Sequence, residues 1–252
     1  MAVKARRVER GGRGSAARER REPLTRERVV DAALQIMDAE GLEAVTMRRV
    51  ARTVGVEAMS LYNHVRDKDD LLQGVCDRVM SGFDFPAAKG DWDDRCRAAA
   101  RSWRRLLQAH PDVMRLFAQT HGPSPTSVES LRPTEFALSL LKEAGLSDRD
   151  TVQAFHAFGG YIQGFVMMEG GSIGHGATAG RARKDITSLP AEAFPCLQTM
   201  GQYFEECDAD EQFEFGLDLL LGGLKARVAG AVPASADGDK RGLDADGARA
   251  ES

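Results

Sequence analysis

The stretch TMRRVARTVGVEAMSLYNHV, residues 46–65, decides the fold. It predicts two short helices joined by a tight turn: Thr46 caps the first, which ends near Gly55, and the second spans residues 58–64. Small and apolar side chains lie where the helices face each other, and Ala51 lets them cross closely. These are the proportions of a helix-turn-helix, whose second helix is short enough to present its first residues to the major groove of DNA.

Polar side chains on the outer faces of these helices suit contact with DNA. Arg48 is the best candidate for a bidentate contact to guanine. In the alternative interpretation, Arg48 is only a solvated charge on the helix surface. Thr46 at a helix N-terminus offers a hydroxyl and backbone N–H groups to a phosphate. Tyr62, His64 and Lys68 are placed to hold the phosphate backbone beyond the recognition helix.

Apolar residues recur every three or four positions on both sides of this motif, and no segment has the pattern of a strand. The sequence therefore predicts an all-α fold. We expect Pro133 to kink or restart the helix that contains it. The other expected helices cover residues 25–40, 67–81, 92–109, 110–119, 126–144, 147–169, 190–204 and 208–228.

The charge is distributed unevenly along the chain. Residues 1–70 hold 15 Lys and Arg against 12 Asp and Glu, whereas the rest holds 19 against 26. A surface for a polyanion therefore belongs in the first part. No apolar run approaches the ~20 residues that span a bilayer, and no secretory signal is present. We expect a cytoplasmic protein, associated with the nucleoid when bound to DNA.

Catalytic and metal-binding patterns are weak. The four cysteines lack the spacing of a zinc site or a disulfide framework. Residues 170–174 spell Gly-x-Ser-x-Gly, but a nucleophile elbow needs a strand before it, and here a helix ends in a Gly-rich loop. No paired carboxylates, H-E-x-x-H motif or phosphate-binding loop is apparent. We expect no enzyme and no catalytic or metal site, although an enzyme or carrier that kept a helix-turn-helix is the alternative class.

The segment VTMRRVARTVGVEAMSLYNHVRDKDDLL, residues 45–72, resembles the DNA-binding segment of TetR-family regulators, especially the tetracycline repressor branch. The match runs without gaps from Leu24 and implies binding of double-stranded operator DNA. Asn63 replaces the aromatic residue of that branch, so the operator sequence cannot be transferred. The resemblance implies base contacts by Arg48, Ala58 and Met59, and phosphate contacts by Thr46, Ser60, Tyr62, His64 and Lys68.

The resemblance continues more weakly into the C-terminal part, where GGYIQGFVMMEGG (residues 159–171) and FEFGLDLLLGGL (residues 213–224) resemble the tetracycline-repressor-type regulatory domain. It implies a repressor released by a small molecule and a homodimer formed through helices 151–169 and 208–228. The last helix supports the dimer, because its apolar surface, at Phe215 for example, exceeds what one core face requires.

The regulatory part is rich in aromatic residues, which suit an apolar or aromatic effector held by few hydrogen bonds, although most of them could be ordinary helix core. Tetracycline–magnesium recognition in the family depends on histidines. The nearest positions in this sequence hold Asp84 and Phe117 instead, and Glu169 alone makes no metal site. We therefore expect no metal or cofactor. A protein partner is the alternative signal to a small ligand. The candidate ligand-binding residues are Trp103, His110, Phe117, Phe136, Phe155, His156, Tyr161 and Gln163.

Four regions follow from these patterns. Residues 1–22 are expected to form a disordered basic arm, which either aids solubility or reaches along DNA, and residues 230–252 a disordered tail. Residues 23–70 form the predicted three-helix DNA-binding domain. Residues 71–229 form the predicted helical domain for regulation, ligand binding and dimerisation.

Overall fold

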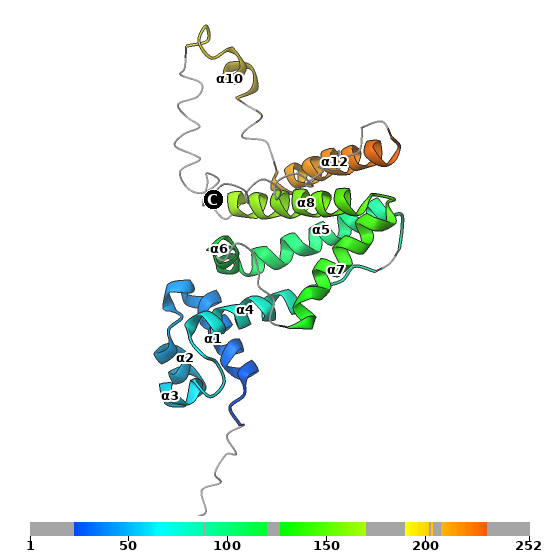
Figure 1. Ribbon diagram of the computed structural model, residues 1–252. Helices are drawn as coiled ribbons and strands as arrows, with labels where there is room; N and C mark the ends of the chain where they lie inside the picture. The colour runs from blue at the N-terminus through cyan, green and yellow to red at the C-terminus, as the bar shows by residue number, and fades with distance from the viewer. Residues whose placement is uncertain are drawn as a thin grey trace, which may run out of the picture.

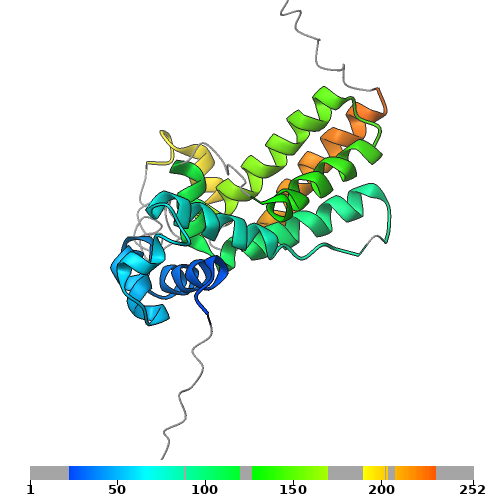
Figure 2. The ribbon, with the colours of Figure 1, turned by 60° about the horizontal axis from the view of Figure 1, so that its bottom comes forward.

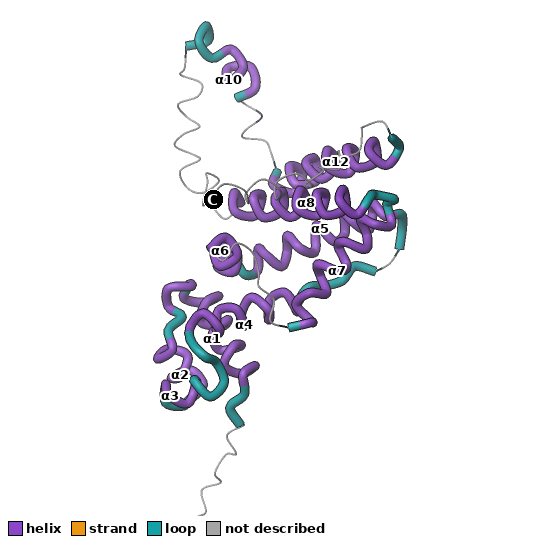
Figure 3. Tube along the Cα trace, in the orientation of Figure 1, coloured by secondary structure: helices purple, strands orange, loops and turns teal. Residues whose placement is uncertain are grey.

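The computed structural model describes residues 23–87, 89–119, 127–169, 190–201, 203 and 208–230, except for the side chains of residues 117–119. All regular secondary structure in these ranges is helical (Figure 3), which confirms the expected all-α fold. The expectations for the basic arm, for the Gly-rich loop at 170–188 and for the tail beyond residue 230 lie outside the described residues.

The N-terminal part consists of short helices around one core. Helix α1 is followed by a 3₁₀ helix, η1, and by the two helices of the helix-turn-helix, α2 and α3 (Figure 1). Thr25 caps α1 by accepting a hydrogen bond from the Arg28 N–H (3.2 Å), as a threonine at this position commonly does. The bounds are Arg26–Glu40 for α1, Leu42–Ala44 for η1, Met47–Val54 for α2 and Ala58–Leu61 for α3.

The rest of the described chain is a stack of longer helices. Helices α5, α7, α8 and α12 run alongside one another, and α12 packs on α8 at the outer edge (Figure 2). No helix in the described part is both long and apolar enough to cross a membrane. The bounds are Lys68–Ser81 for α4, Trp92–Ala109 for α5, Pro111–Gln119 for α6, Val128–Glu143 for α7, Asp148–Glu169 for α8, Pro195–Met200 for α10 and Ala209–Val228 for α12.

Helix α4 joins the two parts. Its side chains Leu71, Val75 and Val79 are buried, and they belong to one apolar cluster that runs from α1 and α2 into α5, α6, α8 and α12. Packed protein interiors transmit displacements because they contain few voids. Helix α4 is therefore packed against helices of both parts.

Helices α3, α10 and α7 differ from the sequence-based expectations. Helix α3 ends at Leu61, because the next three residues form tighter hydrogen-bonded turns, such as the His64 N–H to the Leu61 carbonyl (2.8 Å). The helix expected from residue 190 begins only at Pro195, whose ring suits the first position of a helix. Pro133 does not restart α7; it lies buried within the continuous helix, where packing outweighs the lost hydrogen bond.

Candidate nucleic-acid interface and ligand cavity

Backbone caps fix the geometry of the helix-turn-helix. The Thr46 hydroxyl accepts a hydrogen bond from the Arg49 N–H (3.2 Å), so α2 begins there, and its O–H group can still donate outward. Gly55 ends α2 with φ at 76°, a conformation that suits glycine. Ala51 is buried where α3 packs, and Leu61 is fully buried on the inner side of α3. The other faces of both helices therefore point away from the core.

The outer face of α3 carries apolar side chains that the core does not cover. Met59 is 74% exposed and Tyr62 is 47% exposed. Large exposed apolar groups commonly mark a contact surface. Thr46, Arg48 and Lys68 are also exposed, whereas Ala58, Ser60 and His64 are half-buried, so all eight predicted DNA-contact residues retain accessible surface.

Two neighbouring arginines on α2 differ in their surroundings. Arg49 forms an ion pair with Glu40 of α1 and donates a hydrogen bond to Thr53 (3.2 Å). Arg48 makes no ion pair with any described residue, and it projects from the exposed side of α2. Its guanidinium is therefore available to a ligand outside the chain, whereas that of Arg49 is held within the fold.

A cluster around Arg26, which sequence reasoning did not find, holds the end of the recognition segment. The two terminal nitrogens of Arg26 in α1 donate to both carboxylate oxygens of Asp70 in α4, at 3.0 and 2.8 Å. One of these nitrogens also donates to the backbone carbonyl of His64 (3.0 Å), and Asp70 accepts from the Arg66 N–H (2.8 Å). The Arg26 guanidinium lowers the pKa of the Asp70 carboxyl to about 2.

We predict that Asp70→Asn lowers the free energy of unfolding by about 1–2 kcal/mol at pH 7, after allowance for the partly exposed Arg26. Because the folded-state pKa of Asp70 is depressed to about 2, its stabilisation is complete above the unfolded-state pKa near 4 and is lost as the pH falls through 2. Urea unfolding of both proteins at one protein concentration, from pH 7 to pH 2, should show a difference that shrinks below pH 4. A constant difference would contradict the ion pair.

A cavity of about 590 Å³ lies between α4, α5, α6, α7 and α8. Five of the predicted ligand-binding residues line it. Residues that the sequence did not single out complete the wall. They come from α4 and its end, from α5, α6, α7 and α8. The five predicted residues on the wall are Trp103, Phe136, Phe155, His156 and Gln163, and the additional ones include Met80, Phe83, Cys96, Met114, Pro133, Thr134 and Gly159.

The wall of this cavity is apolar and carries no Asp, Glu, Lys or Arg side chain among the described residues. Burial raises the pKa of the Cys96 thiol to about 12, so this group is neutral at physiological pH. Thr134, His156 and Gln163 supply the hydrogen-bonding side chains. Such a cavity suits an apolar or aromatic molecule that makes few polar contacts.

Three expected ligand-binding residues are not placed on this wall. His110 caps the C-terminus of α5, and its Nδ1 lies 3.0 Å from the Asp38 carboxylate, because the ring turns toward α1. The Tyr161 hydroxyl donates to the Phe213 carbonyl (2.8 Å) on the other side of α8. Phe117 belongs to α6, but its side chain lies outside the described part. Helical spacing alone does not tell which aromatic side chain faces a cavity.

Beside His110, α6 makes a second polar contact with the N-terminal part. An Asp112 carboxylate oxygen accepts a hydrogen bond from the Leu42 N–H (3.0 Å), which starts η1. Helix α6 also contributes Met114 to the cavity wall. The helix-turn-helix part thus contacts the cavity helices through α6 as well as through α4.

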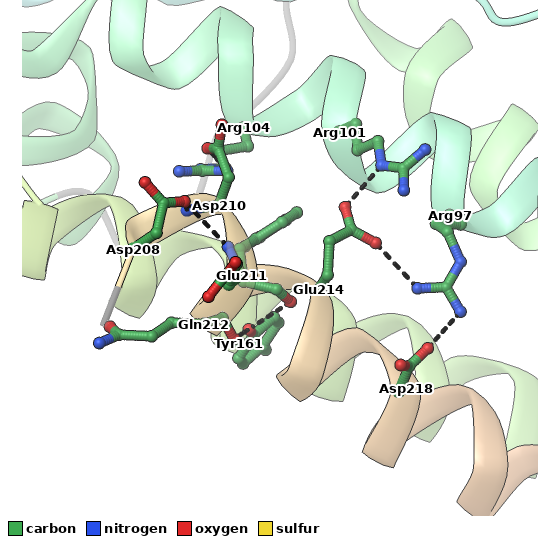
Figure 4. A network of polar contacts seen from close by, with 11 residues as sticks. Arg97, Arg101, Arg104, Tyr161, Asp208, Asp210, Glu211, Gln212, Glu214 and Asp218 are labelled. Atoms are coloured by element: carbon green, nitrogen blue, oxygen red, sulfur yellow. Dashed lines mark hydrogen bonds and ion pairs between the residues drawn. The ribbon is translucent and has the colours of Figure 1, made fainter. Parts of the chain in front are cut away.

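Glu169, the carboxylate expected near a metal by resemblance, is neutralised by Arg104. The Arg104 guanidinium pairs with Glu169 and lies over the Phe213 ring, 4.6 Å from its centre. It also pairs with Asp210 (2.7 Å; Figure 4). Gln108 also donates to Glu169 (3.1 Å). Among the described residues no three His, Cys, Asp or Glu side chains group as metal ligands. The residues present here do not fit a magnesium site.

The same surface of α12 holds a second ion-pair group. Arg97 and Arg101 of α5 both bind Glu214, at 2.9 and 2.5 Å, and Arg97 also reaches Asp218 (2.5 Å) (Figure 4). The hydrogen bond from Arg101 and that from Arg97 lower the pKa of Glu214. These pairs fasten one side of α12 to α5.

The opposite side of α12 is apolar and uncovered. Phe215 is 66% exposed and Leu219 is 64% exposed, whereas Phe213, Leu217 and Leu221 are buried against the rest of the chain. Gly216 lies against the Tyr161 ring, where an added Cβ atom would be 2.2 Å from the hydroxyl. Two apolar faces on one helix are typical of an interface between subunits.

Family models match both parts of the chain. Residues 29–75 match the model described as bacterial regulatory proteins of the tetR family, and residues 85–228 match the tetracyclin repressor-like C-terminal domain. The first match covers the helix-turn-helix, and the second covers α5 to α12 and most of the cavity wall. The two together span most of the described chain.

Individual relatives agree with the family models. The HTH-type transcriptional repressor DrrR1 of Streptomyces coeruleorubidus is 33% identical over 82% of this chain and 79% of its own length. The tetracycline repressor protein class C of Escherichia coli is 30% identical over 80% of this chain and 91% of its own. Among solved structures, apo ActR of Streptomyces coelicolor is 32% identical with a TM-score of 0.75, over 84% of this chain and 99% of its own.

ActR has also been solved in complexes with actinorhodin and with (S)-DNPA. The family consists of transcriptional regulators rather than enzymes, and one relative, BioQ, has been solved with its double-stranded DNA operator. The helix-turn-helix, the helical C-terminal part and the matches to both family models lead to one assignment. This chain belongs to the TetR family of DNA-binding transcriptional repressors.

Proposed function

We propose that this repressor holds its operator as a homodimer and releases it when an apolar or aromatic effector fills the 590 Å³ cavity. The observation that carries this proposal is that α4 lines the cavity at Met80 and also packs against α1 beside the recognition helix. Residues 23–70 are the proposed DNA-binding domain and residues 71–229 the regulatory domain. The protein acts in the cytoplasm, on the nucleoid when bound to DNA.

The proposed DNA contacts are of two kinds, contacts to base edges and contacts to the phosphate backbone. Arg48, Ala58 and Met59 reach base edges, where the arginine fork pairs with guanine and the exposed Met59 meets a thymine methyl group. The remaining contacts, which hold the phosphate backbone and fix the register of the protein, come from Thr46, Ser60, Tyr62, His64 and Lys68. The exposure of these residues supports their assignment.

The proposed dimer forms through residues 151–169 of α8 and 208–228 of α12. Phe215 and Leu219 of α12 are exposed apolar side chains, and Met168 of α8 is a third. In a homodimer such surfaces are buried against their own copies across a two-fold axis. The two recognition helices of such a dimer read half-sites ~34–36 Å apart.

The proposed effector is apolar or aromatic. The aromatic wall supports this class, and so does the uncharged lining around Thr134, His156 and Gln163. ActR binds actinorhodin, and the chain shares its fold over most of its length. Effector binding is proposed to shift α4, because only differential affinity for two states can change the affinity for DNA.

A gel shift on DNA from the region upstream of the repressor's own gene tests the first half of this function. We expect retardation at low salt that weakens as the salt concentration rises, because phosphate contacts release counterions. Absence of retardation at low salt would contradict operator binding there. A screen of aromatic compounds by thermal shift tests the second half, since an effector raises the melting temperature. If a protein partner rather than a small ligand controls the repressor, no compound in the screen would raise its melting temperature.

We predict that Arg48→Ala weakens operator binding by about 1–3 kcal/mol and relaxes the preference at one operator position, because one bidentate base contact is lost. Lys68→Ala is the control, since loss of a phosphate contact weakens operator and random duplexes alike. Fluorescence anisotropy on both duplexes measures the two affinities. Equal losses on operator and random DNA for Arg48→Ala would refute its reading role.

A further inference from the structure

The recognition helix of this repressor is unusually dependent on its surroundings. Helix α3 has four residues, Ala58–Leu61, and continues only as hydrogen-bonded turns to His64. A helix this short is not stable alone, so its direction is set by the residues that its two ends contact. Its N-terminal end follows the turn at Gly55, which leaves the C-terminal end at His64 as the other fixed point.

Besides the buried Leu61 and Val65, one polar side chain holds the C-terminal end of the recognition segment. Arg26 donates to the His64 carbonyl (3.0 Å) and, through both terminal nitrogens, to the carboxylate of Asp70 in the first turn of α4. The Asp70 carboxylate also accepts from the Arg66 N–H (2.8 Å), and only 8% of its side chain is exposed. Three chain segments, from α1, from the end of α3 and from α4, therefore meet at this pair.

Gly74 allows this pair to form. A Cβ atom at Gly74 of α4 would lie 2.8 Å from Val30 of α1 and 3.5 Å from a terminal nitrogen of Arg26. The absence of that atom lets α1 and α4 approach closely enough for the guanidinium to reach Asp70. Both Val30 and Arg26 belong to α1, so the whole helix is held against α4 at this point.

We propose that Arg26 and Asp70 are positioning residues for operator recognition: they tie the end of the recognition helix to α4, so that the orientation of α3 follows the position of α4. Neither residue belongs to the proposed DNA contacts. The inference rests on the proposed entry of α3 into the major groove, and it adds the residues that set the angle of that entry. A small error in this angle removes base contacts and leaves phosphate attraction intact.

The chain offers a matched control. Arg78 of α4 donates to Asp31 of α1 (2.8 Å), so this ion pair joins the same two helices without contacting the recognition segment. Arg26→Gln and Arg78→Gln remove one arginine each from the α1–α4 interface. Arg26→Lys keeps the positive charge but cannot form the bidentate hydrogen bonds to the Asp70 carboxylate.

The experiment uses the full chain and two duplexes, one that the wild-type protein enriches from a random-sequence library and a scrambled version of it. We expect Arg26→Gln to lower affinity for the enriched duplex at least about tenfold and for the scrambled duplex less than about twofold. The ratio of the affinity for the enriched duplex to that for the scrambled duplex measures discrimination. Arg26→Lys should lose most of the wild-type ratio, and Arg78→Gln should keep it. Melting temperatures of the variants give the structural contribution separately.

The inference is overturned if Arg26→Gln lowers both affinities by one factor, if Arg26→Lys keeps the wild-type ratio, or if Arg78→Gln loses as much of it. A wild-type protein that discriminates between the duplexes, together with an Arg26→Gln variant that discriminates equally well, contradicts this inference alone. A wild-type protein that enriches no duplex contradicts the proposed function and this inference with it.

Discussion

Replacing Leu219 by glutamate (Leu219→Glu) is expected to separate the dimer into monomers and to abolish operator binding. Leu219 is 64% exposed on the uncovered face of α12, and a two-fold interface would bury both copies of the new carboxylate. Burying unpaired charges costs several kcal/mol, so the dimer dissociation constant should rise at least about 100-fold. Analytical ultracentrifugation measures the association, and anisotropy measures the loss of binding to the upstream DNA.

The matched control for this substitution is Leu131→Glu, since Leu131 is also an exposed leucine on a helix but lies on α7. We expect it to stay dimeric and to bind DNA like the wild type. If Leu219→Glu remains a dimer at the same concentration, the partner subunit does not pack on this face of α12. If both variants dissociate, added charge rather than position causes the effect.

Filling the cavity at Gly159 is expected to abolish the effector response without changing operator binding. Gly159 lines the cavity, and a Cβ atom added there would meet no heavy atom within 4 Å. Replacing a helical glycine by leucine also favours the helix by up to about 1 kcal/mol, so the fold should tolerate it. Overpacking costs about 1–3 kcal/mol, which corresponds to a 5- to 150-fold loss of effector affinity for Gly159→Leu.

A series of side-chain sizes makes this test specific. Gly159→Ala leaves most of the cavity open and should retain the response, whereas Gly159→Leu and Gly159→Trp should lose it progressively. The probe is the aromatic compound with the largest thermal shift in a screen that includes actinorhodin. Full effector affinity in Gly159→Trp, with operator binding intact, would place the effector outside this cavity.

Most of the fold could be predicted from the sequence, because local signals fix it. Thr25, Thr46 and Asp208 each accept a hydrogen bond at the start of the expected helix. Gly41 and Gly55 end their helices with positive φ. These signals depend on a few neighbouring residues, which a single sequence displays. Helix α10 starts later than expected, at Pro195, whose ring suits the first position of a helix.

The candidate sites were only partly predictable, because they depend on contacts between distant segments. Aromatic spacing indicated Trp103 and Phe155 on the cavity wall, but it could not show that Tyr161 turns toward α12. The pairing of Arg26 with Asp70 joins residues 44 positions apart, so no local pattern indicates it. The expected DNA contacts and the dimer helices stay predictions until the substitutions above are measured.

Ligand-controlled release is tested most directly by measuring the operator affinity of the wild-type protein with and without the compound that raises its melting temperature most. Anisotropy on a labelled duplex from the upstream region gives both affinities at one salt concentration. Saturating compound is expected to lower operator affinity at least about tenfold, because α4 both lines the cavity and packs against the helix-turn-helix part. If a compound whose binding is lost in Gly159→Trp leaves operator affinity unchanged, the cavity does not control release from DNA.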